Sequence, residues 1–145
     1  MIYWDTSALI KLYAPEPDTP YFLDLIGQAQ EPPFSSDITR AEVLCTLYRK
    51  EHAGDLAEGA AVRLFARFLS DAATGRLVLI PNGLDVTTEA QVLVEKSYSQ
   101  PQPTPIRSLD AIHVASALAA RATTLIATDT RLRDVAVLMG LKVLP

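Results

Sequence analysis

Residues 2–9 read Ile2-Tyr3-Trp4-Asp5-Thr6-Ser7-Ala8-Leu9, a β-branched and aromatic run that ends in an acid and passes into a helical pattern. Such a run predicts a short strand followed by a helix. Short apolar runs recur between longer helical patterns at Pro33–Ser35, Leu77–Ile80, Thr124–Ala127 and Lys142–Leu144. Five brief strands that alternate with helices favour βαβ units. We therefore expect an α/β fold with a mainly parallel sheet of about five short strands, buried under helices on both faces.

Seven helices are predicted between these strands. Pro15 ends the first of them, and Gly54, Gly75 and Gly140 follow the third, the fourth and the last. The third and fourth helices indicate an antiparallel hairpin. The predicted helices are Ala8–Tyr13, Pro20–Gln28, Thr39–His52, Leu56–Ala73, Val86–Ser97, Leu109–Arg121 and Arg131–Met139. We find no internal repeat and no linker, so residues 1–145 are expected to form a single domain.

The composition excludes several classes of protein. The chain is 49% hydrophobic and 21% charged, which is too apolar for a disordered protein. Cys45 is the single cysteine and can form neither an internal disulfide nor a thiolate zinc site alone. No apolar run approaches the ~18–20 residues of a membrane span. We therefore expect a soluble protein of a reducing compartment, the cytoplasm, without a membrane partner.

The net charge argues against one kind of nucleic-acid binding. Thirteen Lys and Arg residues against seventeen Asp and Glu residues give −4 at pH 7, the wrong sign for a broad basic surface. If four of the acids form one metal site, however, the remaining charges balance and a divalent cation reverses the local field. A metal-dependent nuclease therefore remains compatible with the charge.

Four acidic residues lie just after a predicted strand or in the first turn of a predicted helix. Asp5 follows the first strand and Asp129 follows the fourth, so a parallel sheet places both at its carboxyl edge, where open α/β sheets bind ligands. Glu42 lies in the first turn of the helix after the second strand. Asp110 lies in the first turn of the helix that precedes the fourth strand, so its position depends on the fold.

Each acid also has a purely structural interpretation. Thr39-Arg40-Ala41-Glu42 fits a capping box, in which Glu42 bonds the Thr39 N–H and adds roughly 1 kcal/mol of helix stability. Asp110 suits a helix dipole, and Asp5 or Asp129 could cap the following helix. Gathered together, however, the four carboxylates would repel one another unless a hard cation such as Mg²⁺ or Mn²⁺ lay among them.

A carboxylate metal site needs no protein nucleophile. It can lower the pKa of a bound water and stabilise charge on the leaving oxygen of a phosphodiester. The sequence offers no obvious alternative, because Ser7 and Ser108 have no evident His partner and no glycine-rich phosphate loop is present.

Four segments resemble, in the same order, those of the PIN-domain ribonucleases, most closely the VapC-type toxins of bacterial toxin–antitoxin pairs. They are Tyr3–Tyr13 (YWDTSALIKLY), Ser36–Val43 (SDITRAEV), Leu109–Ala115 (LDAIHVA) and Thr128–Leu132 (TDTRL). The resemblance implies a three-layer α/β/α sandwich and RNA cleavage that depends on Mg²⁺ or Mn²⁺. It also implies a homodimer and a small cognate antitoxin of the VapB kind. The catalytic and metal-binding residues would be Asp5, Glu42, Asp110 and Asp129.

The chain departs from the pattern at one place, because these toxins often carry a hydroxyl residue two positions before the last acid. Here that position is Ala127, and a neighbouring threonine would have to take its part. Lys11 and Arg107 could meet RNA phosphates, but isolated basic residues are more often solvated surface. We expect His113 to be a packed, hydrogen-bonded side chain, since a carboxylate site for Mg²⁺ has little use for imidazole.

Two alternative functions stay open. A catalytically silent PIN-like module would only bind a partner protein. An aspartate-nucleophile phosphohydrolase would use Asp5, but its usual second acid two residues later is replaced by Ser7. The helices 39–52 and 56–73 also carry more apolar residues than one core-facing stripe needs, which predicts an antitoxin interface. These residues are Val43, Leu44, Leu47, Tyr48, Leu64, Phe65, Phe68 and Leu69.

Overall fold

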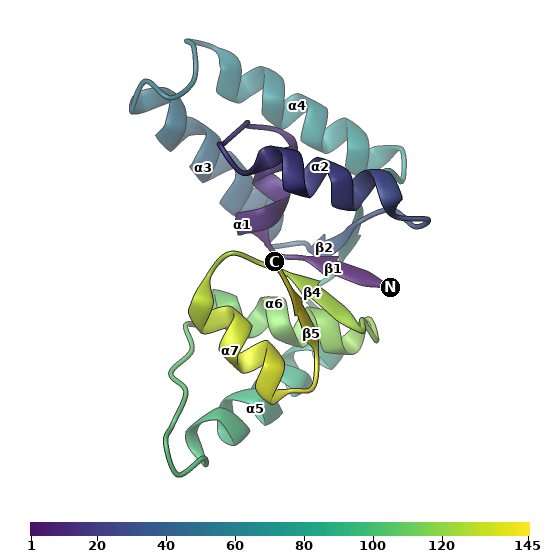
Figure 1. Cartoon of the computed structure of the whole chain (residues 1–145), viewed down its shortest axis with the longest axis vertical. Coiled ribbons are helices and arrows are strands. Elements are labelled where there is room, and N and C mark those ends of the chain that lie inside the picture. Colours follow the sequence, from purple (N-terminus) through teal and green to yellow (C-terminus); the bar gives the residue numbers. More distant parts are fainter.

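The computed structural model describes residues 1–145 and contains a sheet of five strands, all of them parallel. Figure 1 shows helices on both sides of the sheet, so the expected three-layer α/β/α sandwich is confirmed. The strands are β1 (Ile2–Trp4), β2 (Phe34–Ser36), β3 (Val78–Ile80), β4 (Thr124–Ile126) and β5 (Lys142–Leu144). Their order across the sheet is β3-β2-β1-β4-β5, which leaves β1 at the centre.

Seven α-helices and one 3-10 turn connect the strands. They are α1 (Thr6–Leu9) with the 3-10 turn Ile10–Leu12, α2 (Thr19–Gln28), α3 (Thr39–His52), α4 (Ala60–Ala73), α5 (Leu84–Tyr98), α6 (Ser108–Ala119) and α7 (Thr130–Leu138). None of these helices is long and apolar enough to cross a membrane.

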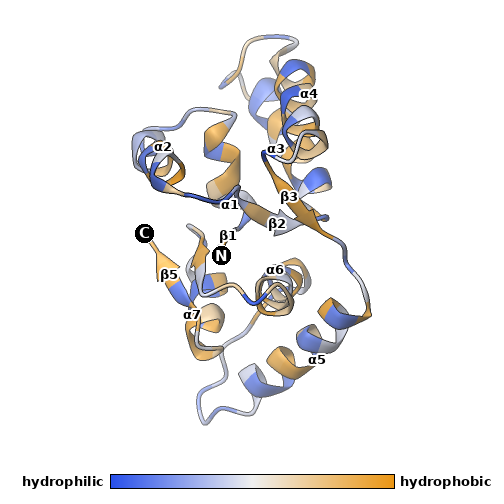
Figure 2. Ribbon diagram, turned by 90° about the vertical axis from the view of Figure 1, so that its right-hand side faces the viewer, coloured by the Kyte–Doolittle hydropathy of each residue, from blue (hydrophilic) through white to orange (hydrophobic).

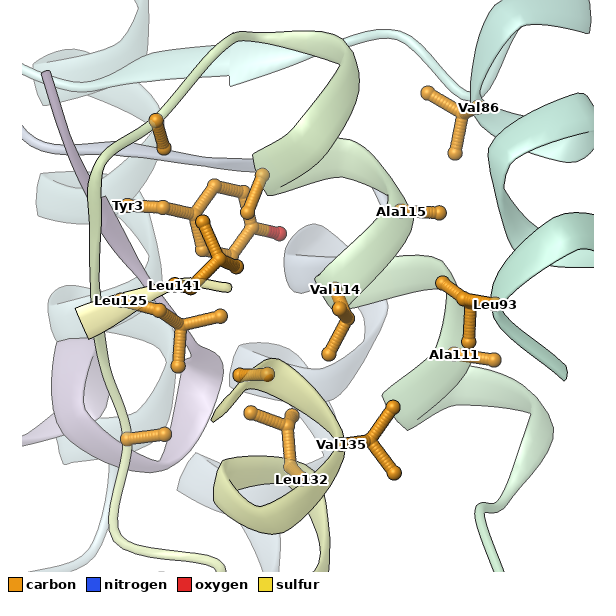
Figure 3. Close-up of a cluster of buried hydrophobic side chains, with 14 residues drawn as sticks. Tyr3, Val86, Leu93, Ala111, Val114, Ala115, Leu125, Leu132, Val135 and Leu141 are labelled. Carbon is orange, nitrogen blue, oxygen red and sulfur yellow. The ribbon is translucent and has the colours of Figure 1, made fainter. Parts of the chain in front are cut away.

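Alternation along the strands divides the core into two layers, because successive side chains of a strand point to opposite faces of the sheet. Tyr3 and Leu125 belong to a cluster with α5, α6 and α7, whereas Trp4 and Ile126 belong to a cluster with α1 to α4. Figure 3 shows the first cluster, which contains Tyr3 and Leu125 of the sheet, Val114 of α6, and Leu132 and Val135 of α7. Both faces of the sheet are therefore buried.

Hydropathy follows this layering. In Figure 2 β3 and α1 are largely hydrophobic, whereas α4 and α5 mix hydrophobic and hydrophilic residues along their length. On α4, Phe68 is fully buried while Val62 is 59% exposed. Such helices bury one apolar stripe against the core and leave the opposite face in water.

Several helix boundaries differ from the sequence prediction by one to four residues, and three of them have a clear local cause. The first helix begins at Thr6, two residues early, because Asp5 caps it. The fourth begins at Ala60 and not at Leu56, because Gly59 has a left-handed φ of 74° that interrupts a helix. The sixth ends at Ala119, since Arg121 adopts a left-handed φ of 57° just beyond it.

Candidate active site

The four predicted acids all line one pocket of about 850 Å³, here called the acid pocket. Asp5 and Asp129 enter it from the ends of β1 and β4, and Glu42 and Asp110 from the first turns of α3 and α6. A helix that connects two parallel strands starts at the carboxyl edge of the sheet, which explains why Asp110 reaches this edge although α6 precedes β4. The structure therefore brings all four acids together; their roles in catalysis and metal binding stay predictions.

Asp5 and Asp129 are both helix caps, as the structural interpretation proposed. One oxygen of Asp5 accepts a hydrogen bond from the Ser7 N–H at 2.9 Å, and Oδ1 of Asp129 accepts one from the Arg131 N–H at 3.0 Å. Each cap occupies one carboxylate oxygen and fixes the side chain. The cap does not use the other oxygen of either acid, so capping and a role in the pocket are compatible.

Glu42 is not part of a capping box, and that expectation is wrong. Ile38 is the N-cap of α3, without a side-chain cap, and Thr39 instead bonds the hydroxyls of Ser35 and Thr6. Glu42 turns toward the sheet, where its Oε2 accepts a hydrogen bond from the Thr6 hydroxyl and lies 2.7 Å from Nε2 of His113. Glu42 therefore bonds residues from distant parts of the chain, Thr6 and His113, and not the Thr39 N–H of its own helix.

His113 contacts two of the acids from the buried side. It is fully buried, as predicted for a packed histidine, and its Nδ1 lies 2.7 Å from the Tyr3 hydroxyl. Its Nε2 lies 2.7 Å from Glu42 and 3.4 Å from Oδ1 of Asp5. Burial opposes protonation of the ring, but the hydrogen bond to Glu42 and the charge of Asp5 hold the pKa of His113 above its ordinary value. In the protonated form both ring nitrogens donate.

The same contact keeps Glu42 ionised. Burial alone would raise the pKa of the Glu42 carboxyl, but the hydrogen bonds from His113 and Thr6 hold it below its ordinary value. Glu42 is therefore a charged, partly buried carboxylate at neutral pH.

Arg107 joins the other two acids. Its Nε donates to Oδ2 of Asp110 at 2.6 Å, and one terminal nitrogen donates to Oδ1 of Asp110 at 3.2 Å and to Oδ2 of Asp129 at 2.6 Å. The side chain remains 55% exposed at the pocket mouth. The expectation that Arg107 is merely solvated surface is therefore incomplete, since its charge already neutralises part of the acid pocket.

The acids consequently form two pairs, one linked by His113 and one by Arg107. Their oxygens have the chemistry that Mg²⁺ and Mn²⁺ prefer. As the side chains lie, however, no three or more His, Cys, Asp or Glu residues are close enough to hold a metal ion. The donor set fits a hard cation, and a cation bound by Asp110 and Asp129 would compete with the Arg107 guanidinium for their oxygens.

Other residues near the pocket were interpreted less well from sequence. Lys11 is 6% exposed and pairs with Glu16 and Asp18, so it is not the solvated side chain we expected. Ala127 is fully buried, and Thr128 lines the pocket beside Asp129. Thr128 is thus the threonine placed to take the part of the hydroxyl residue that Ala127 replaces.

The sequence analysis did not predict that Thr6 contacts Glu42, that His113 contacts Asp5 and Glu42, or that Arg107 bonds Asp110 and Asp129. The contacts of Arg107 and His113 were partly predictable from spacing, because these residues lie three positions before and after Asp110, where side chains share a helix face. Nothing in the sequence pointed to Thr6, whose partners lie 33, 36 and 107 residues away.

Comparison with known proteins agrees with this architecture. The chain resembles VapBC2 from Rickettsia felis, solved with a DNA fragment of its promoter, at a TM-score of 0.70 and 19% identity over 99% of this chain and 98% of the other. It resembles FitAcB from Neisseria gonorrhoeae at a TM-score of 0.72 and 19% sequence identity, over 100% of this chain and 97% of the other. It also resembles VapBC-1 from nontypeable Haemophilus influenzae, at a TM-score of 0.67 and 17% sequence identity over 99% of this chain and 97% of the other. At these identities the likeness shows the fold alone.

Sequence comparison carries the assignment further. No curated protein matches the chain. The sequence model of the PIN domain family, however, matches residues 2–138, which is nearly the whole chain and includes all four acids. The protein therefore belongs to the PIN domain family.

Proposed function

We propose that this PIN domain is a metal-dependent endoribonuclease that acts as the toxin of a toxin–antitoxin pair. The observation that carries the proposal is the convergence of Asp5, Glu42, Asp110 and Asp129 on one pocket at the carboxyl edge of the sheet. Residues 1–145 act as one domain in this proposal, in the cytoplasm. The VapC-type motifs of the sequence and the VapBC and FitAcB folds support the same assignment.

The side chains have different roles in the proposed site. Asp5 and Asp129, fixed by their caps, each present one oxygen to the pocket. His113 and Thr6 keep Glu42 ionised and hold its Oε2 in place. A divalent cation, Mg²⁺ or Mn²⁺, would supply an activated water and stabilise the charge on the leaving oxygen. The protein's own part is thus to hold the four carboxylates in one pocket, beside the phosphodiester that is cleaved.

The test is cleavage of single-stranded RNA with Mg²⁺, with Mn²⁺ or with EDTA. Asp5→Asn and Asp110→Asn should each lower the rate by orders of magnitude, because they remove ligand charge with almost no change of shape. Asparagine caps helices as well as aspartate does, so the α1 cap survives in the first variant. Asp134→Asn is the matched control, because Asp134 is exposed on α7 outside the pocket. Full activity in EDTA, or in either pocket variant, would overturn the proposal.

A catalytically silent binding module is the second candidate. The observation that favours it is the Arg107 bridge, which neutralises Asp110 and Asp129 and leaves no preformed metal cluster. The two functions differ in one measurement. A silent module cleaves no RNA at any Mg²⁺ or Mn²⁺ concentration. The nuclease would cleave RNA once the cation concentration is high enough to compete with Arg107.

The proposed partners are a small antitoxin and a second copy of the chain. Three residues of the predicted interface, Val43, Leu47 and Phe68, are fully buried in the core and cannot serve it. Tyr48 and Leu69 remain 49% and 37% exposed and are the parts of that surface open to a partner. Co-expression with the adjacent small gene, size-exclusion chromatography and a growth assay test the pair. Separate elution with unrelieved toxicity would overturn it, and light scattering of the toxin alone tests the homodimer.

A further inference from the structure

The acid pocket extends along one face of α3. Glu42, Cys45, Thr46 and Arg49 all line it. Their spacing of three and four residues places them on the same side of the helix. From Glu42 to Arg49 the helix advances seven residues, or about 10.5 Å along its axis. The pocket is therefore a groove with the four predicted acids at one end and Arg49 two turns away along α3, and Glu16, Lys50 and Asp55 also line it.

Arg49 differs from every other cation that lines this groove. Lys11 and Lys50 both pair with Glu16, and Arg107 pairs with two of the acids. Arg49 is exposed, and no carboxylate oxygen lies within 4.0 Å of it. Its one hydrogen bond is a long contact of 3.4 Å to the Thr46 hydroxyl. Its guanidinium is thus the uncommitted positive charge of the groove.

We propose that Arg49 binds a phosphate of the RNA strand next to the one that is cleaved, which makes it a substrate-positioning residue. This inference rests on the proposed ribonuclease function. The groove lining carries six acids against four bases, and the other three bases are paired with carboxylates, so Arg49 is the lining cation left to attract an RNA phosphate. A guanidinium offers paired donors that match two phosphate oxygens, and the Thr46 hydroxyl beside it can donate to the same group.

A role of Arg49 in the helix or at a protein interface predicts different results. As a basic residue in the last turn of α3, it could simply complement the helix dipole, and its loss would then change stability and not RNA affinity. It could instead pair with a carboxylate of a protein partner, and its loss would then weaken that complex alone.

The first measurement separates binding from chemistry. Arg49→Gln should raise KM for a short single-stranded RNA about tenfold, or about 1.4 kcal/mol, and leave kcat within twofold. The salt dependence of RNA affinity should become shallower by roughly 0.7 in log Kd per log salt, the contribution of one phosphate contact on a single strand. Arg63→Gln is the matched control, because Arg63 is an exposed arginine on α4 without a carboxylate within 4.0 Å and does not line the groove.

The second measurement locates the strand. Cys45 is the only cysteine of the chain, is exposed and lines the groove between Glu42 and Arg49. RNA that reaches Arg49 must cover this thiol. In Asp5→Asn protein with Mg²⁺, which leaves the RNA intact, an RNA oligonucleotide should protect Cys45 from iodoacetamide. The added change Arg49→Gln should remove most of that protection at the same RNA concentration.

Each outcome has one meaning. If the wild-type chain cleaves no RNA, the ribonuclease proposal fails and the Arg49 inference fails with it. If the wild type cleaves RNA but Arg49→Gln keeps the same KM, salt dependence and Cys45 protection, only the Arg49 inference is overturned. Unchanged RNA affinity combined with weaker binding of the antitoxin would also overturn it and assign the cation to a protein partner.

Discussion

Replacement of Arg107 by glutamine should strengthen metal binding, although it removes a residue of the acid pocket. Arg107 donates three hydrogen bonds to Asp110 and Asp129, and a metal ion must break them. Hydrogen bonds to charged groups contribute about 1.5–3 kcal/mol, but exposed ion pairs contribute only about 0.2–1 kcal/mol. Because the Arg107 side chain is 55% exposed, we expect a gain of about 1 kcal/mol, or roughly fivefold tighter Mn²⁺ binding.

Titration of the protein with Mn²⁺, followed by electron paramagnetic resonance of the free ion, measures this affinity directly. Arg40→Gln is the matched control, since Arg40 also bonds an aspartate three residues away through Nε, at 2.7 Å, but lies outside the acid pocket. Its Mn²⁺ affinity should equal that of the wild type. Unchanged affinity in Arg107→Gln, or an equal change in both variants, would refute competition between guanidinium and metal.

Three further changes test the site and the fold. Glu42→Gln should lower RNA cleavage by orders of magnitude and cost about 1–2 kcal/mol in urea unfolding, because buried His113 loses its charged partner; unchanged cleavage would remove Glu42 from the proposed site, and unchanged stability would refute the contribution of its bond to His113. Glu16→Gln should cost about 1–2 kcal/mol at pH 7. Burial opposes ionisation of Glu16, but Lys11 and Lys50 hold its pKa below the ordinary value, so its contribution is present above about pH 4.5 and is lost as the pH falls through the folded pKa; the variant should show a weaker acid dependence of unfolding. Phe68→Ala should cost about 3–5 kcal/mol in urea unfolding, since the ring is fully buried against Tyr13 and Phe65. A loss below about 1 kcal/mol would place it outside the core.

The sheet and the position of its acids were predictable because their signals are local. A run such as Ile2–Trp4 has strand composition by itself, and the acid that follows it lies at the carboxyl edge in any parallel arrangement. The predicted strands Leu77–Ile80 and Thr124–Ala127 are each one residue longer than the observed ones, and Pro33–Ser35 is displaced by one residue at both ends. The all-parallel topology puts Asp5 and Asp129 at one edge of the sheet, and the pairing of β1 with β4, which was not predicted, brings them together.

The partners of the acids were not predictable, because they come from distant parts of the chain. The capping box assigned to Glu42 has the right local spacing, yet Thr6 and His113, 36 and 71 residues away, compete successfully for its carboxylate. Lys11 looked isolated because its partners lie beyond Pro15, at Glu16 and Asp18. A pattern within one helix carries no information on which buried donor the fold will bring close.

In the proposed function, the four carboxylates form one metal site at which RNA is cleaved. Crystals of the protein grown with Mn²⁺ and measured near the manganese absorption edge test it most directly. We predict an anomalous peak in the acid pocket, at about 2.0–2.2 Å from oxygens of Asp5 and Asp110, with Arg107 withdrawn from Asp110 and Asp129. A pocket without such a peak at millimolar Mn²⁺, with the Arg107 bridge intact, would contradict a metal-dependent mechanism at these four acids.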